Sequence, residues 1–338
     1  MRNYIDTNRR NRTLFLLGPS GVGKSDCVRQ AAQQLGESFG CSFPVLDLRL
    51  SQMEPPDFGG VPSVKRGRTV KNPPAWLPVD PRSRGFVLLD EITSAPPVMQ
   101  AAAYQVALDR CMGDTPIPEG WMVLAAGNRA SDRGVNYPLA APLLARMTLI
   151  NVESSLDGFM DYCARRNVRA EIVAFVRSRG EYLNERDETV NARIGDLPIG
   201  KPFSTQRAWT TAAQYYLDEP AAERLELLRG SVGERAATDL ESFLRIWQSM
   251  PSIEQIFTAP DSAPVPKNAA TRYAISVGVS ARCTNKNFGL AKRYLDRLPA
   301  EFRALAIKLA YMRDNKIAEC EAFSTFVAEN PELWNRAA

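Results

Sequence analysis

Closely spaced glycine, lysine and serine residues mark the segment 13–25, TLFLLGPSGVGKS. Its glycines carry no side chain, so the backbone can adopt positive φ angles and direct several N–H groups at one anion. A helix that starts directly after such a turn adds the partial positive charge of its N-terminus. In the pattern GxxxxGK[ST], Lys24 is placed to reach the β- and γ-phosphates and Ser25 to hold Mg²⁺. The segment therefore predicts a binding site for a nucleoside triphosphate.

Eight consecutive residues make up this predicted site, namely Gly18, Pro19, Ser20, Gly21, Val22, Gly23, Lys24 and Ser25. Thr13–Leu17, directly before them, is an apolar run typical of buried parallel strands. From Val28 to Leu35 apolar residues recur at helical spacing, and we expect that helix to stop at Gly36. An ordinary glycine turn is the alternative. The strand before the turn and the helix after it favour the phosphate site.

Two adjacent acidic residues follow an apolar run in the segment 85–92, GFVLLDEI, about 65 residues after the glycine-rich turn. The apolar residues predict a buried strand whose carboxyl end delivers Asp90 and Glu91 beside the phosphates. Asp90 can hold Mg²⁺ through its water shell, and Glu91 can orient or polarise the attacking water. The alternative is a strand that ends in a solvated acidic turn. The position after a phosphate loop, among alternating strands and helices, favours the catalytic interpretation.

Three more polar residues lie at the ends of predicted elements. Asn128 follows the apolar strand 121–126, where its amide can position water or the γ-phosphate, although Gly-Asn is also a common turn. Arg146 ends a short helix before the last predicted strand, a position that suits a surface role as well as a catalytic one. Arg207 falls in the first turn of a helix that we expect Ser204 to cap.

The secondary-structure elements that must position these residues alternate between strands and helices in the first part of the chain and are helices alone in the rest. Strands are predicted at 13–17, 44–50, 85–92, 121–126 and 148–152. A helix capped by Ser94 is expected to run to about Arg110, and from Ser154, which with Asp157 resembles a capping box, the pattern is helical. The predicted parts are an α/β nucleotide-binding domain at 1–152, a helical lid at 153–218 and a helical extension at 219–338.

One segment, 53–84, departs from this alternation because it is rich in proline, glycine and basic residues. It predicts an excursion from the sheet. Its single tryptophan, Trp76, is expected to be exposed among basic side chains and to contact a substrate.

Composition limits the chemistry further. The 338 residues, 45% hydrophobic, can bury a sizeable core and suggest about two domains. The absence of histidine and the scattered six cysteines disfavour a zinc site, a disulfide framework and His-based acid/base chemistry. We expect a soluble, cytoplasmic protein without a membrane segment, since no apolar run is long enough and the start has no signal-peptide character. A net charge of +4 makes nucleic acid an unlikely partner.

The order of the motifs resembles that of the AAA+ ATPases, and within them the MoxR-like group. The motifs are GPSGVGKS, LLDEI, AAGN, LLARM and STQRAW, and SAPPVMQAAAYQVALD after the acidic pair is also similar. The resemblance is specific over residues 13–152 and looser over 153–218. Residues 219–338 carry no motif that adds to it. The fold implied is a P-loop NTPase α/β/α domain with a parallel sheet, followed by an all-helical lid and a helical extension.

The resemblance also implies roles for the residues already singled out. Gly18–Ser25 is similar to Walker A, Asp90 and Glu91 to Walker B, Asn128 to sensor 1, Arg146 to the arginine finger that completes a neighbour's site, and Arg207 to sensor 2. ATP and Mg²⁺ are the expected ligands. Members of the group usually form a hexameric ring that remodels a protein partner, often one with a von Willebrand factor type A domain, and an insert like 53–84 tends to face the pore.

Other function classes stay open at this point. A DNA-directed AAA+ motor of clamp-loader or helicase type predicts a basic stripe and salt-sensitive DNA binding, which the near-neutral charge disfavours. A nucleotide-gated scaffold with little turnover is disfavoured by the intact acidic pair. A small-molecule kinase needs a pocket for the acceptor substrate, and no motif here indicates one.

Overall fold

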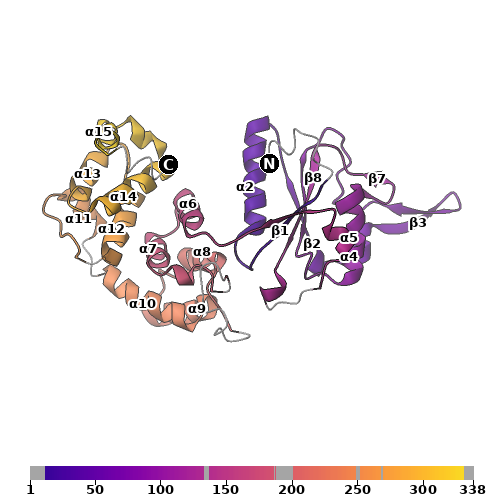
Figure 1. The fold of residues 1–338 in the computed structure, drawn as a ribbon, viewed down its shortest axis with the longest axis horizontal. Helices are drawn as coiled ribbons and strands as arrows, with labels where there is room; N and C mark the ends of the chain where they lie inside the picture. Colours follow the sequence, from indigo (N-terminus) through magenta and orange to yellow (C-terminus); the bar gives the residue numbers. More distant parts are fainter. Residues whose placement is uncertain are drawn as a thin grey trace. The chain divides into compact units, whose positions relative to one another are not determined.

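The computed structural model describes residues 12–132, 137–185, 187, 201–248, 252–267 and 269–330. The chain forms two compact units, Met1–Glu153 and Ser154–Ala338. Strands and helices alternate in the first unit, and the described part of the second consists of helices and turns (Figure 1). This arrangement confirms the predicted fold class, a parallel α/β domain followed by helices.

A five-stranded parallel sheet is the centre of the first unit, with the strand order β2-β5-β8-β1-β9. Its strands are β1 (Leu14–Leu17), β2 (Val45–Arg49), β5 (Gly85–Asp90), β8 (Trp121–Gly127) and β9 (Thr148–Asn151). All five predicted apolar runs are therefore strands. Because the strands are parallel, their carboxyl ends meet at one edge of the sheet, where polar residues from distant parts of the sequence come together.

Both faces of the sheet are covered, and alternate residues of β5 pack into different cores. Phe86 and Leu88 belong to the core that includes α2 (Lys24–Phe39), whereas Val87 and Leu89 belong to the core beneath α4 (Pro97–Tyr104). Figure 1 shows α2 on one side of the strands and α4 with α5 (Ala141–Leu144) on the other. This double burial explains why β5 reads as a continuous apolar run.

Two predicted helix boundaries in this unit are wrong. The helix after the phosphate loop does not stop at Gly36 but continues to Phe39, and Gly40, with φ 62°, forms its left-handed C-cap. The residue at the N-cap of α4 is Pro96 and not Ser94. A π-helical turn, Gln105–Asp109, extends α4 towards the predicted end near residue 110.

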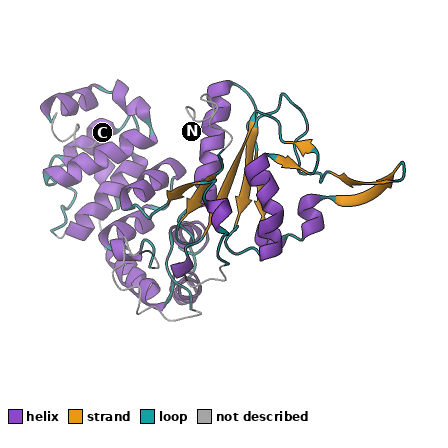
Figure 2. Cartoon of the chain, turned by 45° about the vertical axis from the view of Figure 1, so that its right-hand side comes forward, coloured by secondary structure: helices purple, strands orange, loops and turns teal. Residues whose placement is uncertain are grey.

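The excursion at 53–84 contains elements of its own. A short helix, α3 (Pro55–Gly59), precedes an antiparallel hairpin of β3 (Val61–Lys65) and β4 (Arg68–Asn72). The hairpin extends away from the sheet of its unit and turns at two residues with positive φ, a conformation that suits tight hairpins (Figures 1 and 2). A second small hairpin pairs β6 (Cys111–Met112) with β7 (Thr115–Pro116).

Trp76 is not the exposed aromatic that the sequence predicts. It is half-buried and packs against the core on the α4 side of the sheet. Its ring lies 5.4 Å from that of Phe58, and its Nε1 donates a hydrogen bond to the Phe58 carbonyl at 3.2 Å. The basic side chains of the hairpin, not Trp76, are exposed. An aromatic residue among prolines is buried here because α3 supplies a partner for it.

The second unit contains ten described helices. They are α6 (Leu156–Arg166), α7 (Ala170–Ser178), α8 (Gln206–Tyr215), α9 (Ala221–Val232), α10 (Glu234–Gln248), α11 (Ile253–Thr258), α12 (Ala269–Arg282), α13 (Phe288–Leu295), α14 (Ala300–Arg313) and α15 (Glu321–Glu329). Trp209 and Leu240 share one core although they lie on opposite sides of the predicted boundary after residue 218. The described parts of the predicted lid and extension thus belong to one compact unit.

Two helix caps in this unit differ from the prediction by one residue. Ser155, not Ser154, caps α6 and accepts a hydrogen bond from the Gly158 N–H. Thr205, not Ser204, caps α8. Residues 188–200, the greater part of the polar connection before α8, lie outside the described residues. None of the helices described in either unit combines the length and apolar character needed to cross a bilayer.

Candidate functional site

The loop between β1 and α2 has the backbone conformation that its glycines predict. Gly21 and Gly23 have φ angles of 75° and 94°, which residues with side chains rarely adopt. Gly18 is required for a different reason: a Cβ atom there would lie 2.2 Å from the carbonyl oxygen of Val152. The loop therefore depends on glycine both for its turn and for its close approach to the end of β9.

Lys24, the first residue of α2, is buried, and its amine is held by oxygen atoms. Nζ donates hydrogen bonds to the carbonyls of Gly18 at 2.8 Å and Pro19 at 2.9 Å, and to Asn128 Oδ1 at 2.9 Å. An ammonium group has three donors, and these oxygens can satisfy all of them. A positive charge is thereby fixed at the loop where phosphate oxygens are expected.

Ser25 and Asp90 meet directly at the carboxyl edge of the sheet. Ser25 Oγ donates a hydrogen bond of 2.6 Å to Asp90 Oδ2, and the other carboxylate oxygen accepts the Glu91 N–H at 2.9 Å. A hydroxyl and a carboxylate are hard oxygen ligands of the kind that Mg²⁺ prefers. This pair can therefore hold the cation that the sequence predicts.

Glu91 has an unusual backbone and a partner that sequence reasoning missed. Its φ of 57° lies in the left-handed region, where a residue with a side chain is strained. Ser51 Oγ donates a hydrogen bond to Glu91 Oε2. Ser51 follows β2, the strand paired with β5, so the only sequence signal for it is a hydroxyl directly after a predicted strand.

Asn128 links the loop to a second residue that the sequence did not single out. Its Oδ1 accepts the bond from Lys24, and its backbone N–H donates to Thr93 Oγ1 at 2.9 Å. Thr93 is buried, and a Cβ atom on Gly127 would lie within 2.8 Å of its side chain. Thr93 can approach closely only because position 127 is glycine, and this contact fixes the backbone at Asn128.

Neither of the two arginines predicted to act on the nucleotide takes part in the hydrogen bonds that hold this cluster in the described structure. Arg146 is exposed just beyond α5, and within the described structure its side chain makes no hydrogen bond or ion pair with the residues of the cluster. Arg207 is exposed in the first turn of α8 and belongs to the second unit. The structure thus brings Lys24, Ser25, Asp90 and Asn128 together, and it leaves both arginine roles as predictions.

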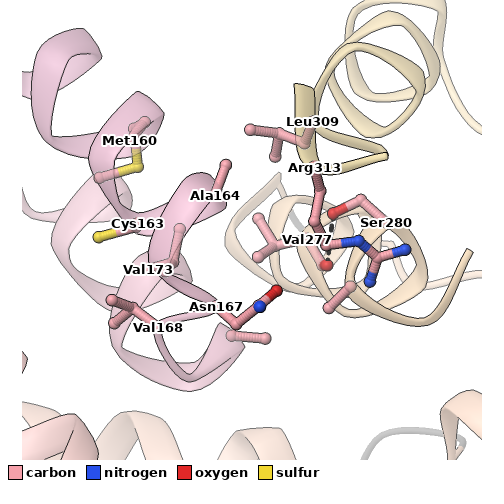
Figure 3. A pocket seen from close by; sticks show the side chains of 12 residues that line it. Met160, Cys163, Ala164, Asn167, Val168, Val173, Val277, Ser280, Leu309 and Arg313 are labelled. Atoms are coloured by element: carbon pink, nitrogen blue, oxygen red, sulfur yellow. Dashed lines mark hydrogen bonds between the residues drawn. The ribbon is translucent and has the colours of Figure 1, made fainter. Parts of the chain in front are cut away.

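A small hollow in the second unit has different chemistry. It lies between α6–α7 and α12–α14 and has a volume of about 40 Å³ (Figure 3). Most of the side chains around it are apolar, among them Met160 and Val277. Burial raises the pKa of the Cys163 thiol at its wall to about 12, so this thiol stays protonated and unreactive near neutral pH.

Comparisons with known proteins give likenesses to solved structures alone, at low identity. No protein-family model and no curated protein matches the sequence. Similar solved structures include NtrX from Brucella abortus, with 13% identity and a TM-score of 0.33 over 98% of this chain and 67% of that chain. Another NtrX structure is a complex with ADP, at 13% identity and a TM-score of 0.32 over the same shares of the two chains.

Two further solved structures show a similar degree of likeness. A RuvB mutant from Thermotoga maritima has 12% identity and a TM-score of 0.35, over 82% of this chain and 78% of that chain. Hsp104 with ATPγS and casein has 17% identity and a TM-score of 0.36, over 72% of this chain and 43% of that chain. Likeness at these levels does not bear on activity, which follows from the site itself.

Proposed function

We propose that this chain is a Mg²⁺-dependent ATPase of the AAA+ type, related to the MoxR-like group. The observation that supports the proposal is the convergence of Lys24, Ser25, Asp90 and Asn128 through hydrogen bonds of 2.6 to 2.9 Å. These residues come from three separate sequence segments at the carboxyl ends of neighbouring strands. A fixed cation, a hydroxyl–carboxylate pair and an amide are the groups that hydrolysis of a nucleoside triphosphate requires.

Each group has one task in this proposal. Lys24 binds the β- and γ-phosphates, together with the N–H groups of the loop. Ser25 and Asp90 hold Mg²⁺, which when bound neutralises charge on the phosphate oxygens. Asn128 orients the γ-phosphate or the water beside it, and Thr93 holds its backbone N–H.

Glu91 is the proposed residue that orients and polarises the attacking water. Its Oε2 accepts a hydrogen bond from Ser51, which restrains the side chain, and the other lone pairs of the carboxylate can accept from water. The same bond favours a second candidate function, a nucleotide-gated scaffold in which Glu91 stays engaged and turnover is slow. A turnover assay on the assembled protein separates the two.

Assembly and partners complete the proposal. Arg146 is exposed on the unit that carries the site, as a residue that reaches into a neighbouring subunit must be. We propose that a hexameric ring places Arg146 in a neighbour's site, that Arg207 reaches the nucleotide from the lid, and that the ring remodels a protein partner, for example one with a von Willebrand factor type A domain. The exposed basic hairpin at 61–72 replaces Trp76 as the proposed contact with that partner.

Two substitutions test the site. Lys24→Ala removes the charge that faces the phosphates, so a fluorescent ATP analogue should bind at least about tenfold more weakly. Glu91→Gln keeps the shape of the side chain but is a poor base, so ATP should stay bound while hydrolysis stops. Glu37→Gln, an exposed change on α2, is the matched control and should leave both properties unaltered. Wild-type binding by Lys24→Ala would place the nucleotide elsewhere.

A mixing experiment tests action between subunits. Arg146→Ala should bind ATP normally and hydrolyse it poorly, because the finger stabilises charge that develops only in the transition state. When Arg146→Ala and Glu91→Gln subunits are mixed, an intact arginine can complete a neighbouring site whose glutamate is intact, and activity should return. Mixed oligomers that are confirmed by mass and stay inactive at every ratio would argue against the finger in trans.

A further inference from the structure

Basic side chains are concentrated on the antiparallel hairpin of β3 and β4. The segment 58–79 contains no acidic residue, and it contains four basic ones: Lys65, Arg66, Arg68 and Lys71. The rest of the chain carries equal numbers of basic and acidic residues, 38 of each, so these four side chains account for the net charge of +4. A local excess of charge in an otherwise balanced chain favours a partner of opposite charge.

Two of these charges stand directly opposite each other next to the turn. In the register of the hairpin Lys65 is opposite Arg68, and both residues are exposed. Like charges opposite one another on a strand pair are destabilising. Neither side chain forms an ion pair or a hydrogen bond with another residue that the structure describes. The hairpin therefore bears an electrostatic cost that an acidic ligand at this pair would remove.

The face that carries this charged pair also carries apolar side chains. Because successive residues of a strand point to opposite faces, Val61 and Val70 share the face of the pair. Val61 is 60% exposed and Val70 is 39% exposed, so neither is covered by the core. We call this surface the hairpin face, and it consists of Val61, Lys65, Arg68 and Val70. It offers cations near the turn and apolar contacts farther from it.

The backbone of the hairpin offers a further means of recognition. β3 and β4 form a two-stranded sheet, so each has an edge that pairs with no other strand in the described chain. β3 contains Pro62, which has no N–H to donate, whereas every residue of β4 has one. An extended peptide can add to such an edge, and its alternate side chains then lie beside those of β4.

We infer that the hairpin face and the edge of β4 bind an extended acidic segment of the protein partner. Its carboxylates lie over the pair of Lys65 and Arg68, and its apolar side chains contact the exposed valines. The inference deepens the proposed function and rests on it, because that proposal makes the hairpin the contact with a protein partner. Nucleic acid fits this surface less well, since the hairpin 61–72 has no aromatic side chain on which a base could stack.

Binding of a labelled peptide to the full-length protein, measured without nucleotide, tests the inference. The probe is Glu-Glu-Val repeated three times, and its control has glutamine in place of every glutamate. At low ionic strength the acidic peptide should bind at least about tenfold more tightly than its control, and salt should reduce the difference.

Charge reversal on the hairpin should weaken this binding. Lys65→Glu and Arg68→Glu should each raise the Kd of the acidic peptide by about tenfold, because an attraction becomes a repulsion. Arg82→Glu is the matched control. It changes the total charge by the same amount on an exposed side chain outside the hairpin, and it should bind the peptide like wild type.

A second measurement separates ligand binding from an effect on folding. Lys65→Glu places opposite charges across the strand pair, so amide hydrogen exchange of the hairpin should slow by up to about fivefold while peptide binding is lost. Weaker binding by a more stable hairpin cannot come from lost structure. If exchange becomes faster instead, Lys65→Gln is taken through the same binding experiment with the same criteria.

Several results would overturn the inference. They are equal binding of the acidic and the glutamine peptide, an equal loss of binding in Arg82→Glu and Arg68→Glu, and wild-type binding by both hairpin variants. Tighter binding of an oligothymidylate of the same length would also overturn it and assign the surface to nucleic acid. Failure of the ATPase proposal is a separate outcome, because wild-type ATP binding by Lys24→Ala would leave the peptide measurements unchanged.

Discussion

Gly18→Ala offers a direct test of the geometry around the phosphate loop. The added Cβ atom would lie 2.2 Å from the carbonyl oxygen of Val152 and 3.1 Å from its carbonyl carbon. Ordinary contacts begin above 3 Å, so the end of β9 must move by about 1 Å, and overpacking of this kind costs about 1–3 kcal/mol. The shift also weakens the 2.7 Å hydrogen bond from Val152 N–H to Leu17, worth about 1 kcal/mol.

We therefore expect Gly18→Ala to lower the free energy of unfolding of the α/β unit by about 2–4 kcal/mol, within the sums of these two effects. Urea-dependent amide hydrogen exchange of the central sheet gives the value for this unit, and binding of a fluorescent ATP analogue should weaken in parallel. Gly23→Ala is the matched control. A Cβ atom on Gly23 would have no atom within 4 Å, so the strain of this change comes only from the φ of 94°. That change should cost about 1–2 kcal/mol. Equal stability of Gly18→Ala and wild type would refute the close approach of Val152.

Three further substitutions test other parts of the structure. Ser51→Ala removes the hydroxyl that donates to Glu91. Basal ATP turnover should then rise by up to about tenfold while ATP affinity stays the same. A turnover rate equal to or below that of wild type would mean that Ser51 does not restrain Glu91. Trp76→Ala should lower the free energy of unfolding of the α/β unit by about 3 kcal/mol, because Trp76 packs on Phe58. Unchanged stability with a selective loss of the stimulation of ATPase activity by a partner would contradict that packing. Gly230 is exposed in the interior of α9, and a Cβ atom there would meet no atom within 4 Å. Gly230→Ala should therefore raise the free energy of unfolding of the helical unit by about 0.5–1 kcal/mol, measured as a higher unfolding temperature. A lower unfolding temperature would contradict a helical, exposed Gly230.

Local patterns determined much of this protein. The phosphate loop is contiguous, so its glycines and the Lys24–Ser25 pair identify it without knowledge of any distant contact. The five strands are equally local, because each is an apolar run long enough to be buried on both faces. The meeting of Ser25 with Asp90 also follows from the sequence, since parallel strands end at the same edge of a sheet.

Partners of the site residues depend on strand order, which the sequence pattern does not contain. Ser51 contacts Glu91 because β2 pairs with β5, and Thr93 contacts Asn128 because β8 is the other neighbour of β5. Single hydroxyl residues after strands are common, so neither stands out along the chain. Trp76 was misassigned for a related reason: its burial depends on Phe58, which lies 18 residues earlier in the same excursion and which the short helix α3 brings to it.

The helix caps show most clearly where local information ends. At 154–155 and at 204–205 two hydroxyl residues stand side by side, and either can cap a helix. In both pairs the second residue is the cap, and the N–H of the first residue donates to a buried carboxylate, that of Ser154 to Asp187 and that of Ser204 to Glu185. Sequence alone determined that helices start at these points. Only the tertiary structure decided which hydroxyl caps each helix, since hydrogen bonds to a buried carboxylate outside the pair hold the backbone of the first residue in place.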